Sequence, residues 1–491
     1  MKQLKADIVV VSAGTAGLTA VVAAAELGAK VIAFEKAAVA GGAARMGMGP
    51  FAIESRLQYQ NNVSLTREEA FRIFMDYTHW RVDARLVSDY INKSASTIEW
   101  LEKMGVEFID AKAWWRGSYP TFHSIKGPSG RPGAGAGAAM TNALAQRAQE
   151  LGAQIILETP VKKILKEKGR IVGVIAEDKD GETIQAKAKA VIIATGGFGD
   201  NTEMIKKYVG FEWGKDIFSM RIPGITGDGI RMAWEAGAAQ DEMYMDLTCG
   251  IPGPAAGAPP TPGVISGLGA FHAPNLMVNL QGERFINEEI MVNATFVGNA
   301  LVRQKNRCGF MIFDGAAKKY YEEKGLGYES VFGPSTKFDI DADIKKAIEQ
   351  GHQNIFMANS LEELASKTGI DLAGLQKTVA GYNKACETGH DKILRKKAKY
   401  LKPVKQPKFY AGRYLPSGYG TRGGIKINYK TEVMTQDNEV IPGLYAAGVD
   451  ANAIHGDTYM ILFPGGGMGF ALNSGRIAGE NAAEYVKSLG K

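Results

Sequence analysis

A buried β-strand that runs directly into a glycine turn and a helix constrains this chain more than any other feature. Residues Ala6–Val11 read ADIVVV, a β-branched run expected for a strand covered on both faces of a parallel sheet. The turn Ser12–Gly17 follows, then a predicted helix over 18–27 and a second predicted strand over 31–35. This order predicts a Rossmann-type βαβ unit.

Each part of the unit has a physical role in dinucleotide binding. Gly14 lets a pyrophosphate approach the backbone, and Gly17 lets the helix pack on the strand. The helix N-terminus offers N–H groups and a positive dipole end to the phosphates. Glu35 is expected to accept hydrogen bonds from a ribose hydroxyl. Ser12 replaces the first glycine of the usual GxGxxG pattern, and we expect it to form the turn with a negative φ.

Length and composition indicate the number of domains and the class of protein. A chain of 491 residues is too long for one ordinary core, so at least two domains are expected. Hydrophobic residues make up 45% and charged residues 22%, as in globular proteins. A Pro/Gly-rich stretch at 250–269 predicts a loop, and the apolar spacing predicts helices at 361–368 and 372–388.

Several function classes are disfavoured. The net charge is +6, and the densest basic run, 395–405, is interpreted as a solvated loop rather than a nucleic-acid site. The cysteines Cys249, Cys308 and Cys386 are far apart, so no iron–sulfur, c-type haem or other metal site is expected. No apolar run is long enough for a membrane span, and only five residues precede the first predicted strand. We therefore expect a cytoplasmic protein without a targeting segment.

Further motifs follow the βαβ unit in a characteristic order. They are Glu35-Lys36 with Gly41-Gly42, Ala194-Thr195-Gly196-Gly197, Thr226–Gly229, Arg284–Glu288, Gly423-Gly424 and Gly443–Gly448. With them, nearly the whole chain resembles the flavoprotein family of fumarate reductase and succinate dehydrogenase, which includes urocanate reductases and 3-ketosteroid dehydrogenases. Its length and the lack of active-site arginines also resemble the isoflavonoid-reducing members of the tetrahydrodaidzein reductase type.

The resemblance implies an α/β fold and an FAD cofactor. A Rossmann-like FAD-binding domain in two segments, 1–249 and 396–491, would carry an inserted α+β capping domain at 250–395. Membrane-bound relatives attach FAD through a His after the ribose acid, whereas Ala43 stands there in this chain, which implies non-covalent FAD. The FAD-binding residues implied are Ser12, Gly14, Ala16, Gly17, Glu35, Lys36, Gly41, Gly42, Ala43, Val161, Ala194, Thr195, Gly196, Asp228, Gly448, Asp450, Gly466, Gly467 and Met468. In the family, the final helix, predicted from about Gly467, points its N–H groups at a flavin carbonyl.

Three features that the family uses for dicarboxylates are missing. The acid Arg expected after Asn287-Glu288 is absent from Glu289–Asn293. The His expected before the Gly-Gly turn is absent from Gly418–Gly424. The HGxxR pattern reads His455–Tyr459, with Tyr in place of Arg. Because burying an unpaired dicarboxylate is very costly, fumarate is disfavoured as a substrate.

The candidate catalytic residues are therefore neutral or aromatic for the most part. Gly456–Tyr459 resembles the GxTY of ketosteroid dehydrogenases, in which a Tyr transfers a proton, but Met460–Phe463 intervene before Pro464. Displacement of Tyr459 by this insertion stays open. The aromatic segment Trp114–His123 is either a wall for a flat apolar ligand or an ordinary packed loop. The catalytic candidates are Tyr459, Tyr419, Arg422, Tyr119 and His123, of which His123 also suits a structural role.

These observations predict a flavoenzyme that reduces an activated carbon–carbon bond, or catalyses the reverse, on a neutral small-molecule ring substrate such as a steroid enone or polyphenol. A Tyr would supply the proton. Two alternatives remain, a dicarboxylate or amino-acid oxidoreductase and a non-enzymatic flavin redox sensor. Gly133–Gly137 follows Pro132 rather than a strand, so no nicotinamide domain is indicated. NADH, free reduced flavin and a redox protein remain alternative electron donors.

Overall fold

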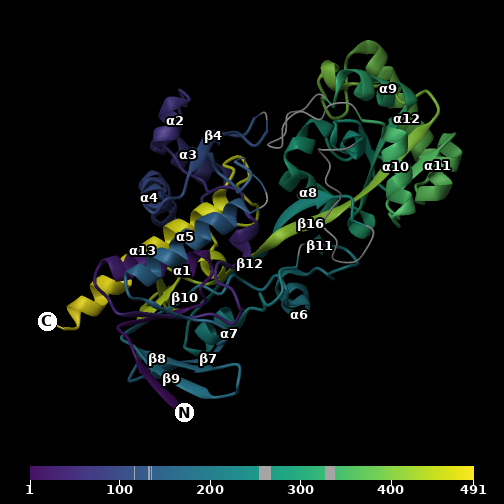
Figure 1. Cartoon of the computed structure of the whole chain (residues 1–491). Coiled ribbons are helices and arrows are strands. Elements are labelled where there is room, and N and C mark those ends of the chain that lie inside the picture. Colours follow the sequence, from purple (N-terminus) through teal and green to yellow (C-terminus); the bar gives the residue numbers. More distant parts are fainter. Residues whose placement is uncertain are drawn as a thin grey trace.

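The computed structural model describes residues 1–490 except 116, 131–132, 134, 220, 254–266 and 327–337. The chain forms two lobes, and two long strands, β12 (Gln240–Gly250) and β16 (Phe409–Ile425), run from one lobe into the other (Figure 1). The larger lobe contains both ends of the described chain. The smaller lobe contains helices α8 to α12.

A six-stranded sheet forms the centre of the larger lobe. Its order is β17-β18-β10-β2-β3-β6, and all neighbouring pairs are parallel except β17 with β18. The strands β2, β3 and β10 are buried at every position, as expected for β-branched runs covered on both faces. The bounds are β2 Ile8–Val11, β3 Val31–Phe34, β6 Gln154–Ile156, β10 Ala190–Ile193, β17 Glu432–Met434 and β18 Val440–Ala446.

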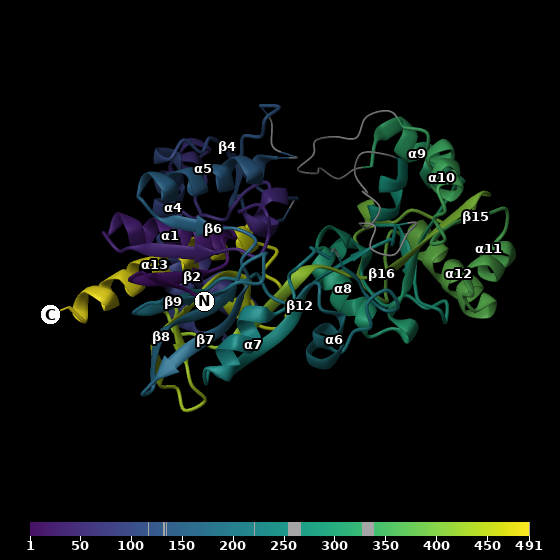
Figure 2. The same cartoon turned by 60° about the horizontal axis from the view of Figure 1, so that its bottom comes forward.

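Two helices, α1 (Thr15–Glu26) and α13 (Gly466–Ser488), pack closely against each other and the sheet (Figure 2). Glycines in α13 permit this approach. A Cβ on Gly475 would lie 2.4 Å from the Ala16 carbonyl oxygen, and one on Gly479 would lie 2.4 Å from that of Ala20. The small residues thus bring the start of α13 beside the glycine turn before α1.

The first strand of the chain differs from the prediction. The predicted strand at 6–11 begins at Ile8, and a separate strand β1 (Lys2–Lys5) precedes it. Only one of its residues is part-buried, so it lacks the apolar pattern that predicts strands. It pairs in parallel with β9 at the edge of a second sheet, ordered β1-β9-β8-β7. The other bounds are β7 Val161–Glu167, β8 Arg170–Glu177 and β9 Thr183–Lys187.

The other elements between β3 and β12 lie outside the central sheet. Their starts follow local capping chemistry: Asp83 accepts hydrogen bonds from the first turn of α4, and Ser55 and Gln58 form a capping box at α2. The bounds are α2 Arg56–Gln60, α3 Arg67–Tyr77, α4 Ala84–Lys103, β4 Phe108–Lys112, β5 Phe122–Ile125, α5 Ala136–Glu150, α6 Thr202–Met204, β11 Phe218–Ser219 and α7 Asp228–Glu235.

The smaller lobe is built on a mixed sheet in which β16 is the central strand. β11, β12, β14 and β15 all pair with β16, and β13 pairs with β14. The helices predicted at 361–368 and 372–388 are found as α11 (Leu361–Thr368) and α12 (Leu372–Thr388). The other bounds are β13 Leu276–Val278, α8 Ala294–Val302, β14 Gly309–Asp314, α9 Gly315–Lys324, α10 Ile340–Glu349 and β15 Ile355–Ala358.

The sheet of the smaller lobe draws strands from outside the stretch 250–395, because β12 ends at Gly250 and β16 begins at Phe409. We retain the division 1–249, 250–395 and 396–491 as a proposal. Most of the predicted loop at 250–269 lies outside the described residues. Within the described part of the chain, no helix combines the length and apolar character that crossing a membrane requires.

Candidate active site

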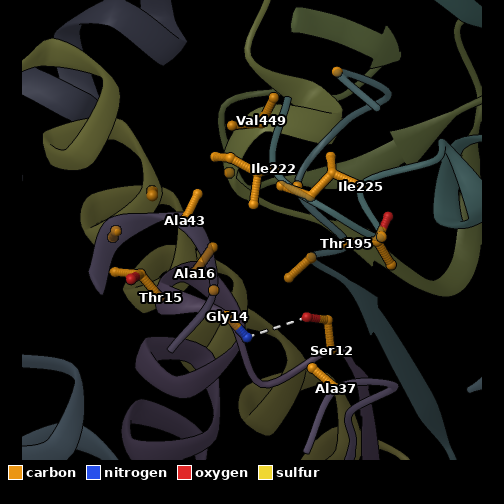
Figure 3. Close-up of a pocket in the computed structure, with 18 of the residues that line it drawn as sticks. Ser12, Gly14, Thr15, Ala16, Ala37, Ala43, Thr195, Ile222, Ile225 and Val449 are labelled. Carbon is orange, nitrogen blue, oxygen red and sulfur yellow. Dashed lines mark hydrogen bonds between the residues drawn. The ribbon is translucent and has the colours of Figure 1, made fainter. Parts of the chain in front are cut away.

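A cavity of about 610 Å³ lies at the carboxyl ends of the parallel strands of the central sheet. The last residues of β2 and β3, Val11 and Phe34, line it, and so do Ala194 and Gly448, which follow β10 and β18. Open α/β sheets bind their ligands at this edge. The turn before α1 forms one side, and residues 222–225 lie opposite, with the side chains of Ile222 and Ile225 facing Ser12 and Gly14 across the space (Figure 3). The start of α13 and strand β16 close another part of the wall.

The turn before α1 differs in detail from the expectation. Ser12 has a φ of 87°, not a negative value. Its side chain compensates for this strained conformation: the hydroxyl accepts a hydrogen bond from the Gly14 N–H at 3.1 Å (Figure 3) and also donates one to Glu35 at 2.8 Å. The two hydrogen bonds of its hydroxyl thus hold Ser12 in the turn conformation that the first glycine adopts in the usual GxGxxG pattern.

Two acidic residues, Glu35 and Asp228, line the cavity. Glu35 lines it, is 7% exposed, and accepts hydrogen bonds from the backbone N–H groups of Ala13 and Ala37. The Lys36 ammonium contacts the Asp228 carboxylate at 2.6 Å at the start of α7. Burial alone would raise the pKa of Asp228, but Lys36 and Thr226 outweigh it and hold that pKa below its ordinary value.

The structure brings most of the predicted FAD-binding residues to this cavity. Those that line it are Ser12, Gly14, Ala16, Glu35, Lys36, Gly42, Ala43, Val161, Ala194, Thr195, Gly196, Asp228, Gly448, Gly467 and Met468. They come from both sequence segments that the larger lobe combines.

Four predicted FAD-binding residues do not line the cavity. Gly17 serves packing, because a Cβ there would lie 2.0 Å from the Ser12 carbonyl oxygen. Asp450 is fully buried and accepts hydrogen bonds from Thr195 and from the Gly197 N–H. Gly41 has a φ of 116° in the turn, and a Cβ on Gly466 would lie 3.3 Å from the Tyr459 hydroxyl. These residues therefore shape the cavity from behind.

The lining suits FAD. Gly14 has open space on the cavity side, where a Cβ would meet nothing of the protein closer than 3.5 Å. Gly42 lies so close to the turn that a Cβ would approach the Gly14 Cα to 3.1 Å. The cavity thus joins a small-residue turn at a helix N-terminus, which fits a pyrophosphate, to an acidic residue after β3, which fits a ribose.

Tyr459 reaches the start of α13 despite the four residues that follow it. Its hydroxyl oxygen accepts a hydrogen bond from the Gly467 N–H at 2.9 Å. The insertion is absorbed locally, because the Ile461 N–H turns back to the Tyr459 carbonyl at 2.8 Å and Met460 and Phe463 are buried in the core. In the described part of the chain nothing accepts the phenolic proton. Tyr459 is 8% exposed and lies behind Gly467 and Arg422, which line the cavity, rather than in the lining itself.

This bond also changes the expected role of α13. Gly467 lines the cavity, but its N–H is directed to Tyr459 rather than to the cavity's contents. Burial raises the pKa of Tyr459 far above its ordinary value, so the phenol stays protonated. The hydrogen bond from the Gly467 N–H opposes this rise of the Tyr459 pKa but does not overcome it.

Arg422 on β16 lies beside Tyr459. The guanidinium carbon is 5.2 Å from the centre of the Tyr459 ring, and the side chain lines the cavity. Behind it, the buried carboxylate of Asp246 on β12 accepts a hydrogen bond from Arg422 Nη2. Burial raises the pKa of Asp246 and Arg422 opposes that rise, whereas burial would lower the pKa of Arg422 and Asp246 more than compensates.

His455 completes the buried side of this group. Its ring centre is 4.6 Å from that of Tyr459, and burial lowers its pKa well below the ordinary value. Nδ1 accepts the Met460 N–H at 3.4 Å, so the neutral ring carries its proton on Nε2. Nε2 is buried and has no partner among the described residues.

An apolar cluster that does not line the cavity surrounds Tyr459. Trp115, Tyr459 and Ile461 form a buried cluster, with Trp114 and Val292 packed against it. Because Val292 comes from the smaller lobe, both lobes contribute to this cluster. Neither Trp114 nor Trp115 lines the cavity, so the role of Trp114–His123 as a ligand wall stays a prediction. Arg116 lies outside the described residues.

Of the other catalytic candidates, Tyr419 lies at the cavity, whereas Tyr119 and His123 pack inside the protein. Tyr419 lines the cavity and is 58% exposed. Tyr119 packs on Phe463 with ring centres 5.2 Å apart and supports the insertion. His123 is fully buried; its Nε2 lies 2.6 Å from the Ser55 hydroxyl and Nδ1 lies 3.0 Å from the Thr121 carbonyl oxygen. This is the structural role considered for His123, and burial lowers its pKa to about 4.

Sequence reasoning missed Asp246 and the segment 222–225. Asp246 stands alone in a strand that alternates irregularly, and nothing local indicates its partner Arg422, 176 positions later. The segment 222–225 contains Pro223-Gly224 just before the Thr226–Gly229 motif, a turn signal that was available.

Comparison with known proteins adds to this geometry. The family model described as FAD binding domain matches residues 7–468. Vinyl phenol reductase of Lactiplantibacillus plantarum is 34% identical over 98% of this chain and 97% of its own length. A fumarate reductase (cytochrome) of Shewanella frigidimarina is 30% identical over 98% of this chain and 77% of its own length.

A solved structure shows the same architecture. The 3-ketosteroid-Δ4-(5α)-dehydrogenase of Rhodococcus jostii superimposes with a TM-score of 0.77 at 24% identity, over 98% of each chain. The predicted fold class, a Rossmann-like domain in two segments with an inserted capping domain, is thereby confirmed.

Proposed function

The chain belongs to the FAD-binding flavoprotein family that includes fumarate reductases and 3-ketosteroid dehydrogenases and is an FAD-dependent oxidoreductase, and on this basis we propose that it reduces an activated carbon–carbon double bond of a neutral, largely apolar ring substrate. Bound FAD would exchange a hydride with the substrate. Conjugated phenols, other polyphenols and steroid enones are the candidate substrates.

One observation carries the proposal: both cations among the described residues that line the cavity are already paired. Arg422 is paired with Asp246, and Lys36 with Asp228. A dicarboxylate would therefore lose its hydration without an uncompensated positive charge to replace it, which is costly. A neutral substrate pays no such penalty.

In this proposal Tyr459 is the proton donor. The Gly467 N–H occupies one lone pair of its hydroxyl and orients the free O–H away from the helix. The Tyr77 hydroxyl bonds to the Tyr459 carbonyl at 2.9 Å and fixes the backbone at that point. The phenolic proton would pass to the substrate carbon or oxygen on which negative charge develops.

The name of the relative from Lactiplantibacillus plantarum supports a neutral aromatic alkene as substrate class. Non-covalent FAD is part of the proposal, because Ala43 lines the cavity where a tethering His is absent. NADH, free reduced flavin or a redox protein would supply the electrons.

The test is anaerobic reoxidation of the photoreduced enzyme, followed by flavin absorbance. The panel contains 4-vinylphenol, an isoflavone, a steroid enone and fumarate. We expect at least one neutral compound to reoxidise the flavin faster than fumarate. If fumarate is the fastest oxidant of the panel, the neutral-substrate proposal is wrong.

A further inference from the structure

Asp246 occupies an unusual place behind the cavity wall. It is 1% exposed and lies on β12, whose Tyr244 pairs directly with Arg422 of β16. The ladder is interrupted between Met245 and Leu247, so Asp246 sits in a bulge. Bulges next to active sites re-aim a side chain, and here the bulge directs the carboxylate at the Arg422 guanidinium.

The ion pair is incomplete. Asp246 uses only Oδ2 toward Arg422 Nη2, while Asp246 Oδ1 and Arg422 Nε are buried with no partner in the described part of the chain. A pair that served stability alone would favour two parallel hydrogen bonds with every polar atom satisfied. Only Arg422 reaches the cavity, so Asp246 acts on the cavity's contents through the charge of Arg422.

We propose that Asp246 determines the charge class of the substrate: by neutralising Arg422, it makes the site select neutral compounds and reject carboxylates. The inference rests on the proposed function. Without the Asp246 charge, Arg422 would stand uncompensated at the cavity beside Tyr459. A buried guanidinium in that position binds a carboxylate through charge-assisted hydrogen bonds.

The experiment measures binding to the oxidised, FAD-loaded enzyme, so that no turnover intervenes. Dissociation constants are obtained by calorimetry for 4-ethylphenol and 4-ethylbenzoate, two ligands of the same ring size that differ in charge. Asp246→Asn removes the charge and keeps the shape. We expect it to tighten 4-ethylbenzoate binding at least about tenfold, as one gained charge-assisted hydrogen bond implies. Binding of 4-ethylphenol should change less than about threefold on the same scale.

Two controls identify the cause. Glu242→Gln neutralises an exposed carboxylate on the same strand, which pairs with Arg81 outside the cavity, and should leave both constants unchanged. Adding Arg422→Gln to Asp246→Asn should abolish the gain for 4-ethylbenzoate. A purely structural role for Asp246 would instead weaken both ligands together and lower Tm.

The ratio of the 4-ethylbenzoate constants of wild type and Asp246→Asn tests the inference by itself, whichever ligand the wild type prefers. If these two constants differ by less than threefold in a folded variant that retains FAD, the inference about Asp246 is wrong. The neutral-substrate proposal is judged separately, and it stands if the wild type binds 4-ethylphenol more tightly than 4-ethylbenzoate. Asp246→Ser is the second variant if Asp246→Asn does not fold. Failure of both to retain FAD would assign the pair to the fold and also overturn the inference.

Discussion

The hydroxyl of Tyr459 accepts the N–H of Gly467, the second residue of α13, at 2.9 Å. This contact joins an aromatic side chain to a helix N-terminus at the cavity wall. It leaves the phenolic proton free and places it in the field of the helix dipole. The mechanism proposed here depends on that geometry.

Tyr459→Phe should therefore keep FAD and the fold but slow substrate-driven flavin reoxidation by about 100-fold or more, the usual effect of removing a general acid. Burial raises the pKa of Tyr459, so its proton is retained as pH rises and the wild-type rate should not fall through titration of this group between pH 7 and 9. Stopped-flow absorbance of both proteins checks this. A rate within a few-fold of wild type would remove Tyr459 from the mechanism and shift attention to Tyr419 and Arg422.

Fumarate should neither bind tightly nor be reduced at a useful rate. Arg422 and Lys36 are both paired with carboxylates, so no described cation of the cavity wall is free for a dicarboxylate. Calorimetry with the oxidised enzyme measures binding, and reoxidation of the photoreduced enzyme measures turnover. Micromolar binding of fumarate together with rapid reoxidation would contradict this expectation.

The purified protein should be yellow and should release its FAD when precipitated with acid. Ala43 lines the cavity and has no group that forms a covalent bond to the flavin. The absorbance spectra of supernatant and pellet give the result directly. Flavin that remains in the pellet after denaturation would contradict non-covalent binding.

Gly14→Val should abolish the yellow colour. The protein atom nearest to a Cβ at Gly14 would be the Ser12 hydroxyl oxygen at 3.5 Å, so we expect the branched side chain to project into the space proposed for the pyrophosphate. Flavin content per protein and Tm are the measurements. Gly381→Ala, on α12 with nothing within 4 Å of its added Cβ, is the matched control and should retain FAD. Full FAD occupancy in Gly14→Val would place the pyrophosphate elsewhere.

His123 should contribute to stability rather than to turnover. Burial lowers its pKa from 6.5 to about 4, so the unfolded chain takes up a proton at a higher pH than the folded protein. Its contribution is complete above pH 6.5 and is lost as pH falls toward 4, by up to about 1.4 kcal/mol per pH unit.

We accordingly expect His123→Gln to have a lower free energy of unfolding than wild type at pH 7. The difference between the two free energies should become smaller as pH falls from 6.5 to 5. Denaturant unfolding at each pH measures the difference. His390→Gln, at an exposed position, is the control and should leave the stability unchanged. A difference that is constant with pH, or a large loss of kcat at pH 7, would contradict the structural role.

Much of the cofactor site could be predicted from local sequence. Strands β2, β3 and β10 are uniform apolar runs, and the residues at their carboxyl ends meet at one edge of a parallel sheet. Ser12 shows the limit of this reasoning. The glycine replacement was visible, but its positive φ depends on Glu35, which the next strand brings within 2.8 Å of the hydroxyl.

By itself, the sequence determined the family, the two-segment FAD-binding fold and most of the residues around the cofactor cavity, because these depend on short motifs whose spacing follows strand and helix geometry. Only the tertiary structure decided that Tyr459 reaches Gly467 across the insertion, that His123 is buried against Ser55, and that Asp246 neutralises Arg422. Each of these depends on how distant segments pack. No local pattern records that packing, since a hydrogen bond or an ion pair requires only that the atoms meet in space, whatever their separation along the chain.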